Sequence, residues 1–384
     1  MSQIISLKIS VVVTFNLTHK ENFSILLPRK SKLLSLKLQD ENMRIKIEEL
    51  EHLLARSASK YVTLTDAEYF AKCTLHTHFR KAAPRVNPLE YAIDDLNNWR
   101  DRENTEIKTE VDHGSISVLN FNGLAPSLKI KTVHDTLAHK ARKNGIAAAG
   151  FYNSAGVEIL FPWAAGLVEQ DLIGIAMFNG GCGYCVPYGG RRGVFGTNPL
   201  AYAIPTSTDP IILDMATTEM AFFKLQEAKE KGCPLRPNVA VNHDGQPTVD
   251  ASQALTDDDI ANLLPIGGGF KGYGLVLLIE ILTGPLVSSL LSTQQTSGWN
   301  PTECGCLVIA IDIKNFTDPV KFKTSLTVMC ERLRSMHPAE GFDTIKIPGD
   351  RGLEKMKEIM QQGELEVDYK MVRELEELAR KTAH

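Results

Sequence analysis

The spacing of hydrophobic residues near the N-terminus predicts two consecutive helices. From Met43 onward, apolar residues recur at helical spacing over residues 45–61. The sequence Thr65-Asp66-Ala67-Glu68 has the form of a capping box, in which a threonine bonds a backbone amide and an acid reaches back. We therefore expect a second helix to begin there and to run through residues 75–78.

Prolines limit how far this second helix can extend. Pro84 and Pro88 interrupt regular helix geometry, so we expect His78 to lie near a helix end, where the chain turns. Residues 94–111 are polar and charged without a clean period. We expect an exposed helix and loop there.

From Ile116 the pattern changes to short apolar segments that alternate with amphipathic ones, which predicts an α/β fold. The predicted strands cover residues 116–121, 146–151, 173–178, 200–204, 211–214 and 306–313. The predicted helices cover residues 133–143, 163–169, 220–231, an apolar and buried helix at 272–291, and amphipathic closing helices at 319–336 and 351–381.

Composition narrows the class of protein. Of 384 residues, 43% are hydrophobic and 23% are charged, as in ordinary globular proteins, and the net charge is -4. This charge favours neither nucleic acid nor an anionic membrane as a partner, and apolar runs such as residues 274–282 are too short to span a bilayer. We expect a cytoplasmic protein with a small-molecule partner, without nucleic acid or membrane.

Residues 1–42 differ from the rest of the chain. They carry six Lys/Arg against three acids and contain an interrupted apolar stretch at residues 1–15. We interpret them as an extension, disordered or not native, and residues 43–384 as one unit. Within that unit we expect an N-terminal helical part at 43–115, an α/β part at 116–315 and C-terminal helices at 316–384.

The glycine-rich segment Gly267–Gly272 formally matches a dinucleotide-binding signature. That signature requires a preceding strand and an acidic residue some twenty positions downstream, and no acid lies between Glu280 and Glu303. The segment therefore fails as a Rossmann fingerprint. A glycine loop that opens a helix and carries a lysine still has two interpretations: it binds phosphate, or it is only a tight turn that requires glycine.

Four of the seven cysteines lie in two close pairs. Cys182 and Cys185 form a CxxC, and Cys304 and Cys306 form a CxC more than a hundred residues later. A zinc site of four cysteines needs two Cys-x2-Cys pairs, and a redox CxxC normally opens a helix. We therefore favour loop cysteines and expect no metal, with a metal or redox protein as an alternative.

Candidate catalytic residues lie close together at the expected end of the second helix. His78 follows Thr77 and precedes Arg80, Lys81 and Arg85, which combines a hydroxyl, an imidazole and several cations. By themselves these residues are more typical of a solvated helix end than of a catalytic site. The competing segment 112–114, Asp-His-Gly, is interpreted as a loop.

Asp214 closes a predicted strand. A carboxylate at the carboxyl end of a strand is a common active-site placement in α/β proteins and also a common helix cap.

Together these segments resemble the malate/L-lactate dehydrogenase-like oxidoreductases, from about Met43 to the C-terminus. The resemblance is carried by five short motifs in a specific order: Phe195–Ala201, Leu213–Thr217, Asn242–Thr248, Leu264–Gly274 and Ile347–Asp350. It implies a non-Rossmann α/β fold with flanking helical segments, a homodimer, and NAD or NADP as cofactor. It also implies hydride transfer at the alpha carbon of a 2-oxo, 2-hydroxy or cyclic 2-imino acid.

The family motif Ser-His-Gly…Pro-Arg places a proline and an arginine six and seven positions after its histidine, as Pro84 and Arg85 follow His78 here. The resemblance therefore implies that His78 is the proton donor. It also implies that Thr77 takes the place of the serine and that Asp214 completes a relay with both.

Arg80 and Arg85 are the candidate contacts for the substrate carboxylate. The stretches that match cofactor-binding segments contain Ile212, Leu213, Met215, Ala216, Thr217, Phe270, Lys271, Gly349, Asp350 and Arg351.

The chain departs from the family motifs at three positions. Phe79 replaces a glycine, Ala82 replaces an arginine near the substrate carboxylate, and Gly156 replaces a second active-site histidine. We interpret these changes as a sign that the protein acts on a different substrate from other members of the family. The alternative is a catalytically impaired, nucleotide-binding paralogue with a scaffold or regulatory role.

Overall fold

A computed structural model describes residues 42–80, 86–102, 105–256, 260–296 and 300–380. The chain divides into two units, 1–41 and 42–384, and only the second is described here. Pro84 and Arg85, together with Lys81 and Ala82, lie outside the described residues.

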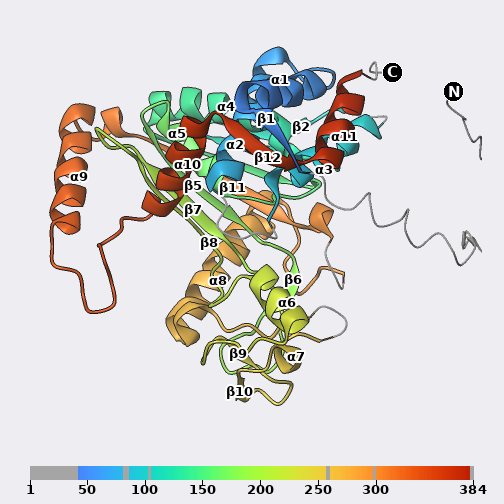
Figure 1. Cartoon of the computed structure of the whole chain (residues 1–384), viewed down its shortest axis with the longest axis vertical. Coiled ribbons are helices and arrows are strands. Elements are labelled where there is room, and N and C mark those ends of the chain that lie inside the picture. Colours follow the sequence, from blue (N-terminus) through green and yellow to red (C-terminus); the bar gives the residue numbers. More distant parts are fainter. Residues whose placement is uncertain (1–41, 81–85, 103–104, 257–259, 297–299, 381–384) are drawn as a thin grey trace, which may run out of the picture. The chain divides into compact units, whose positions relative to one another are not determined.

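The centre of the second unit is a seven-stranded sheet with the order β2-β3-β4-β11-β5-β7-β8 (Figure 1). Only β3 and β4 are parallel, and the other neighbours are antiparallel. This mixed sheet confirms an α/β fold that is not of the Rossmann type. Its strands are β2 (Lys108–His113), β3 (Ile116–Asn120), β4 (Ile146–Tyr152), β5 (Leu172–Phe178), β7 (Leu200–Ile204), β8 (Ile211–Met215) and β11 (Gly305–Asp312).

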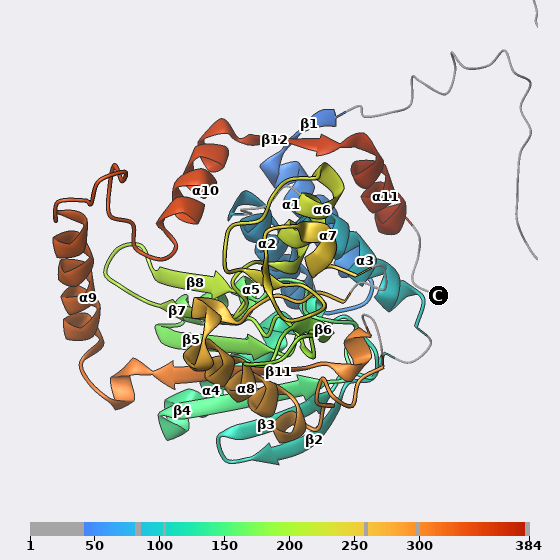
Figure 2. The same ribbon diagram turned by 90° about the horizontal axis from the view of Figure 1, so that it is seen from below.

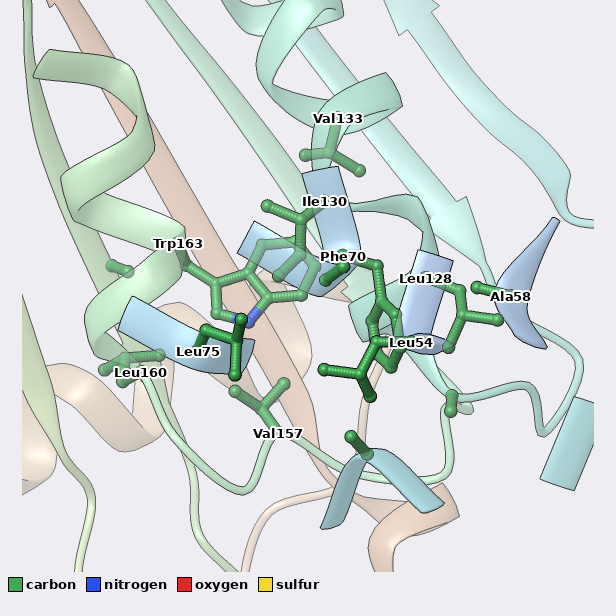
Figure 3. Close-up of a cluster of buried hydrophobic side chains, with 14 of the residues drawn as sticks. Leu54, Ala58, Phe70, Leu75, Leu128, Ile130, Val133, Val157, Leu160 and Trp163 are labelled. Atoms are coloured by element: carbon green, nitrogen blue, oxygen red, sulfur yellow. The ribbon is translucent and has the colours of Figure 1, made fainter. Parts of the chain in front are cut away.

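Five helices pack around one main hydrophobic core beside this sheet: α1 (Ile47–Ala58), α2 (Leu64–Arg80), α3 (Pro88–Arg100), α4 (Ile130–Asn144) and α5 (Phe161–Val168). Part of this core is shown in Figure 3, where Phe70 and Leu75 of α2 lie close to Trp163 of α5. Trp163 is 2% exposed, so it anchors α5 in the core.

The prediction of an exposed helix and loop at 94–111 was wrong in part, because most described residues from 100 to 111 are exposed but α3 has a buried face. Leu96 and Trp99 of α3 are buried, because a helix that starts at Pro88 presents them on one face together with Leu89 and Ala92. Residues 108–113 form an edge strand, so Asp112 and His113 belong to β2 and not to a loop.

The predicted helix start at Thr65 was also wrong by two residues. The hydroxyl of Thr63 accepts a hydrogen bond from the Asp66 amide at 3.2 Å and donates to the Asp66 carboxylate at 2.9 Å. Thr63 therefore caps α2, with Asp66 as its partner. Asp66 is buried, whereas Glu68, the partner that the predicted capping box requires, is exposed.

The C-terminal segment contains a strand that was not predicted. Helices α10 (Asp350–Gln362) and α11 (Tyr369–Arg380) are separated by β12 (Glu364–Asp368), which pairs with β1 (Asn42–Lys46). Figure 2 shows β1 and β12 side by side between α10 and α11. The two short strands were missed because each needs a partner more than 300 residues away. Helix α9 (Pro319–Arg334) precedes α10.

The apolar helix predicted at 272–291 is α8 (Phe270–Thr283), and it is not fully buried. Val276 and Ile279 are buried, whereas Leu278 and Ile281 are 51% and 53% exposed. Residues Phe270–Val287 are long and apolar enough to cross a membrane by length and composition alone, a test that core helices also pass.

A second, smaller core lies beyond the main sheet, at the end of Figure 1 where β9 and β10 are drawn. It is built from β6 (Cys182–Cys185), α6 (Phe222–Lys231), β9 (Ala240–Val241), β10 (Pro247–Thr248) and α7 (Ala251–Ala254).

Candidate active site

The end of α2 carries the predicted proton donor. The described part of α2 runs to Arg80, so the helix end that the prolines predict stays a prediction, and Thr77 and His78 are 7% and 8% exposed. The Thr77 hydroxyl donates a 2.7 Å hydrogen bond to the carbonyl oxygen of Cys73, one turn earlier. The donor capacity of this hydroxyl is therefore used within its own helix.

Asp214 lies on β8 and bonds α5. Its carboxylate accepts a hydrogen bond of 2.8 Å from the backbone N–H of Phe161, the first residue of that helix. Burial raises the pKa of Asp214 to about 6, and the bond from Phe161 opposes this rise. In the described residues no hydrogen bond joins Asp214 to Thr77, so the implied relay is not formed by direct contact in this structure.

Arg80 is docked against two other segments. Its Nη2 donates to the carbonyl oxygen of Gly349 at 3.2 Å, and its guanidinium carbon lies 4.9 Å from the centre of the Phe161 ring. Burial lowers the pKa of the Arg80 guanidinium, and Asp209 opposes this effect. These contacts tie the end of α2 to the start of α5 and to the loop before α10.

Strand β8 brings the predicted cofactor segments together. The Ile212 amide donates to the carbonyl of Pro348 at 3.0 Å, which joins β8 to the loop that contains Gly349. Beyond the strand, the Thr217 carbonyl accepts from the Ile266 amide at 2.8 Å. Segment 212–217 therefore bonds both the loop that contains Gly349 and the loop that precedes Phe270, although these loops are distant in sequence.

Some side chains of these segments bond protein groups. The buried Thr217 hydroxyl donates to the carbonyl of Asn198 at 2.9 Å. Asp350 accepts from Arg334 at 2.7 Å and from the Ile347 amide at 2.8 Å. Although burial opposes it, the bond from Arg334 lowers the pKa of Asp350.

The remaining members of these segments keep accessible surface. Leu213, Met215 and Ala216 are partly exposed, Phe270 is 70% exposed, and Lys271 and Arg351 are also exposed.

The glycine loop before α8 has a left-handed backbone at two consecutive glycines. Gly267 and Gly268 have φ values of 74° and 61°, and no heavy atom lies within 4 Å of where a Cβ would stand on either. The Gly267 amide donates to the carboxylate of Glu219 at 2.5 Å. Because Glu219 accepts from this loop, the structure shows that at least one loop amide can bind a carboxylate.

A cavity of about 60 Å³ lies against the α2 face that carries Thr77. Its lining includes Asp95 from α3 together with Gly156 and Glu158 from the loop before α5. Sequence reasoning singled out Thr77 and Gly156 but missed both carboxylates. No local signal identifies them, because the three segments meet only in the folded chain.

The cysteines do not form a metal site in the part of the chain that the structure describes, where no group of three or more metal-ligating side chains occurs. Cys182 and Cys185 lie in strand β6, which corrects the prediction of a loop. Burial raises the pKa of the Cys185 and Cys304 thiols to about 12. Such thiols carry little thiolate at neutral pH.

Comparison with known proteins relates this geometry to a family. Residues 45–376 match the family described as malate/L-lactate dehydrogenase. A malate/(S)-sulfolactate dehydrogenase from Methanothermus fervidus is 33% identical over 279 residues, which cover 72% of this chain and 78% of that protein. A Δ1-pyrroline-2-carboxylate reductase from Pseudomonas fluorescens is 36% identical over 213 residues, covering 54% and 59%.

Solved structures show the same fold. The sulfolactate dehydrogenase of Methanocaldococcus jannaschii superposes with a TM-score of 0.74 at 26% identity, covering 88% of this chain and 96% of that one. The family match spans most of the chain and includes α2, β8 and the loop before α10, which carry the site. This chain belongs to the malate/L-lactate dehydrogenase family.

Proposed function

We propose that this protein is an NAD(P)-dependent oxidoreductase that transfers a hydride between nicotinamide and the alpha carbon of a 2-oxo, 2-hydroxy or cyclic 2-imino acid. One observation supports it most directly: β8 carries the carboxylate of Asp214, and its segment 212–217 bonds the loop before α10 at Pro348 and the loop before α8 at Ile266. The relatives described above are dehydrogenases and reductases, which supports activity over the alternative of a scaffold paralogue.

The residues around β8 fit a nicotinamide dinucleotide. The exposed Lys271 and the start of α8 offer positive charge and backbone donors for phosphate groups, whereas the Gly267 and Gly268 amides already bond Glu219 and Pro265. Gly349 has a φ of 104°, and a Cβ there would lie 3.1 Å from the Ile212 carbonyl oxygen, so this turn needs glycine. When bound, the cofactor supplies or accepts the hydride.

We assign the proton to His78. In reduction, the imidazolium donates a proton to the oxygen or nitrogen on the alpha carbon, and in oxidation the neutral ring accepts it. Thr77 and Asp214 act as positioning residues: Thr77 is fixed by Cys73, and Asp214 holds the start of α5 beside Arg80. Arg80 and Arg85 are the candidate cations for the substrate carboxylate.

We also propose a homodimer that works in the cytoplasm. The face of α8 that carries Leu278 and Ile281, together with Leu286 just beyond the helix, is exposed and apolar, as expected of a surface covered by a second copy. The described cysteines are present as thiols, which agrees with a reducing compartment. Light scattering coupled to size exclusion tests the dimer, and a monomer at micromolar concentration would contradict it.

The decisive experiment follows NADH and NADPH oxidation over pyruvate, oxaloacetate, 2,3-diketogulonate and Δ1-piperideine-2-carboxylate. The His78→Ala variant should lose about 100-fold or more in kcat while still binding reduced cofactor. His243→Ala is the matched control, because His243 is an exposed histidine whose side chain is 80% accessible. A His78 variant as active as its parent contradicts the assignment, and cofactor binding without turnover of any substrate favours the scaffold alternative.

A further inference from the structure

The cavity beside Thr77 is enclosed by helices and by the loop before α5. Phe70, Ile130, Val157 and Trp163, all labelled in Figure 3, form part of its apolar wall. Its volume of about 60 Å³ is several times the ~10–15 Å³ that one water molecule needs, so a group of roughly four heavy atoms fits.

The charged groups that line this cavity are acidic, and its other polar groups include the hydroxyls of Thr74, Thr77, Tyr91 and Ser127. Asp95 and Glu158 both line it, and among the described lining residues there is no lysine, arginine or histidine. The Ser127 hydroxyl donates to one oxygen of Asp95 at 2.5 Å. Asp95 is partly exposed and Glu158 is exposed, although the protein atoms packed around both carboxyl groups desolvate them, so both can meet an entering group.

The two carboxylates are unfavourable when both are charged. Burial raises the pKa of Asp95 to about 8, with Ser127 opposing and the nearby Glu158 adding to the rise. Burial and Asp94 raise the pKa of Glu158 to about 7. A positively charged group between them would relieve this repulsion, whereas an anion would increase it.

The position of the cavity connects it to the reaction. It adjoins Thr77, the residue before the proposed proton donor, and it borders Gly156, where the family carries a second active-site histidine. With no side chain at Gly156, the space beside Thr77 is left to Asp95 and Glu158. Thr77 and His78 are consecutive residues of α2, so the cavity lies against the helix turn that carries the proposed proton donor.

We infer that this cavity is a specificity subsite, in which Asp95 and Glu158 bind a cationic nitrogen group at the end of the substrate distant from the reacting carbon. The inference rests on the proposed function, since it assigns the far end of the substrate of that same site. A guanidinium or primary ammonium group has the size and the charge that the cavity accepts.

The first test compares 2-oxo acids that differ only at the far end. The panel is 5-guanidino-2-oxopentanoate, 2-oxohexanoate and 2-oxoglutarate, which end in a cation, a methyl group and a carboxylate. The guanidino acid should have a kcat/KM about tenfold or more above the other two. In Asp95→Asn and Glu158→Gln this advantage should fall about tenfold, mainly through KM.

These variants are suited to the test because neither removes a charge that stabilises the folded protein. Each amide matches the shape of the carboxyl group that it replaces, and each removes a charge that burial disfavours, so the variants should fold. Glu90→Gln is the matched control, since Glu90 is an exposed acid on the same helix as Asp95 but does not line the cavity.

A second test is independent of catalysis. Calorimetric titration with methylguanidinium should show saturable binding to the parent and to Glu90→Gln, and about tenfold weaker binding to Asp95→Asn and Glu158→Gln. Turnover of the panel without a cation preference overturns the subsite and leaves the proposed function standing. Methylguanidinium binding that depends on both acids, without turnover of any acid, overturns the proposed function and supports the subsite.

Discussion

The carboxylate of Asp214 and the backbone N–H of Phe161 are joined by a 2.8 Å hydrogen bond that fixes the start of α5 to β8. The ring of the same Phe161 lies under the guanidinium of Arg80. Because Arg80 also bonds Gly349, and the neighbouring Pro348 bonds Ile212 of β8, these contacts close a ring around the site. Asp214, Arg80 and Gly349 belong to this ring, and Asp66 separately anchors the start of α2.

The Asp214→Asn variant should change how stability depends on pH. The pKa of Asp214 is about 6 in the folded protein, above its ordinary value of 3.8, so the folded state binds the extra proton between these values. Its contribution to stability therefore decreases as pH rises through that window. Asparagine keeps the acceptor for Phe161 without the charge, so its Tm relative to the parent should be higher at pH 7.5 than at pH 4.

Thermal unfolding of both proteins at each pH provides the measurement, and subtracting the parent removes the effect of all other groups. A Tm difference that is constant from pH 4 to pH 7.5 would contradict the raised pKa. The same variant should also lower kcat, because the start of α5 is positioned from this carboxylate.

Replacing Gly349 by alanine should be costly. Gly349 has a φ of 104°, and the new Cβ would lie 3.1 Å from the carbonyl oxygen and 3.2 Å from the amide nitrogen of Ile212. Gly341→Ala is the matched control, because Gly341 has a φ of 85° but no heavy atom near its Cβ position. The control should lose about 1 kcal/mol of unfolding free energy, and Gly349→Ala about 2 kcal/mol or more.

Urea denaturation measures the two losses, and fluorescence titration measures NADH binding. Only Gly349→Ala should weaken that binding. Equal losses in both variants would show that the contact with Ile212 does not matter.

The Arg80→Met variant separates two roles of this arginine. If Arg80 mainly docks α2 against Phe161 and Gly349, the variant should lose about 1–3 kcal/mol of unfolding free energy, from a charged hydrogen bond and a cation–π contact. If it mainly binds the substrate carboxylate, KM should rise with stability unchanged. The contacts predict the first result, with the exposed Arg332→Met of α9 as control in the same denaturation series.

Asp66 should be a major anchor of α2. It is 4% exposed, and it accepts hydrogen bonds from Lys129 and from the Thr132 hydroxyl, both at 2.8 Å, which tie the start of α2 to α4 and the turn before it. Replacement by asparagine should cost about 3 kcal/mol at pH 7, because it leaves Lys129 without its partner.

This cost should depend on pH. Although burial opposes it, the bonds from Lys129, Thr132 and Thr63 lower the pKa of Asp66 below 3.8 in the folded protein. The stabilisation is therefore present above pH 3.8 and is lost as pH falls further. Chemical denaturation of parent and variant at pH 7 and pH 3 should show the difference shrinking, and a constant difference would refute the lowered pKa.

The sequence by itself determined the elements that depend on local periodicity. Strands such as β5 and β11 and helices such as α4 lie where the apolar spacing predicts them, because alternation and helical repeats are local properties. The end of the second helix beside His78 stays a prediction from the prolines, because residues 81–85 lie outside the described residues. Ordered motifs such as Leu213–Thr217 were sufficient to identify the family.

Only the tertiary structure decided which of these residues meet. The pairing of β1 with β12, the docking of Arg80 on Gly349 and the convergence of Asp95 and Glu158 on one cavity each join segments far apart in sequence. The exposed face of α8 could likewise not be predicted from the sequence. An apolar helix has the same composition whether or not its own chain covers it. Such contacts depend on how distant segments pack, and the local pattern of hydrophobic and polar residues does not determine that packing.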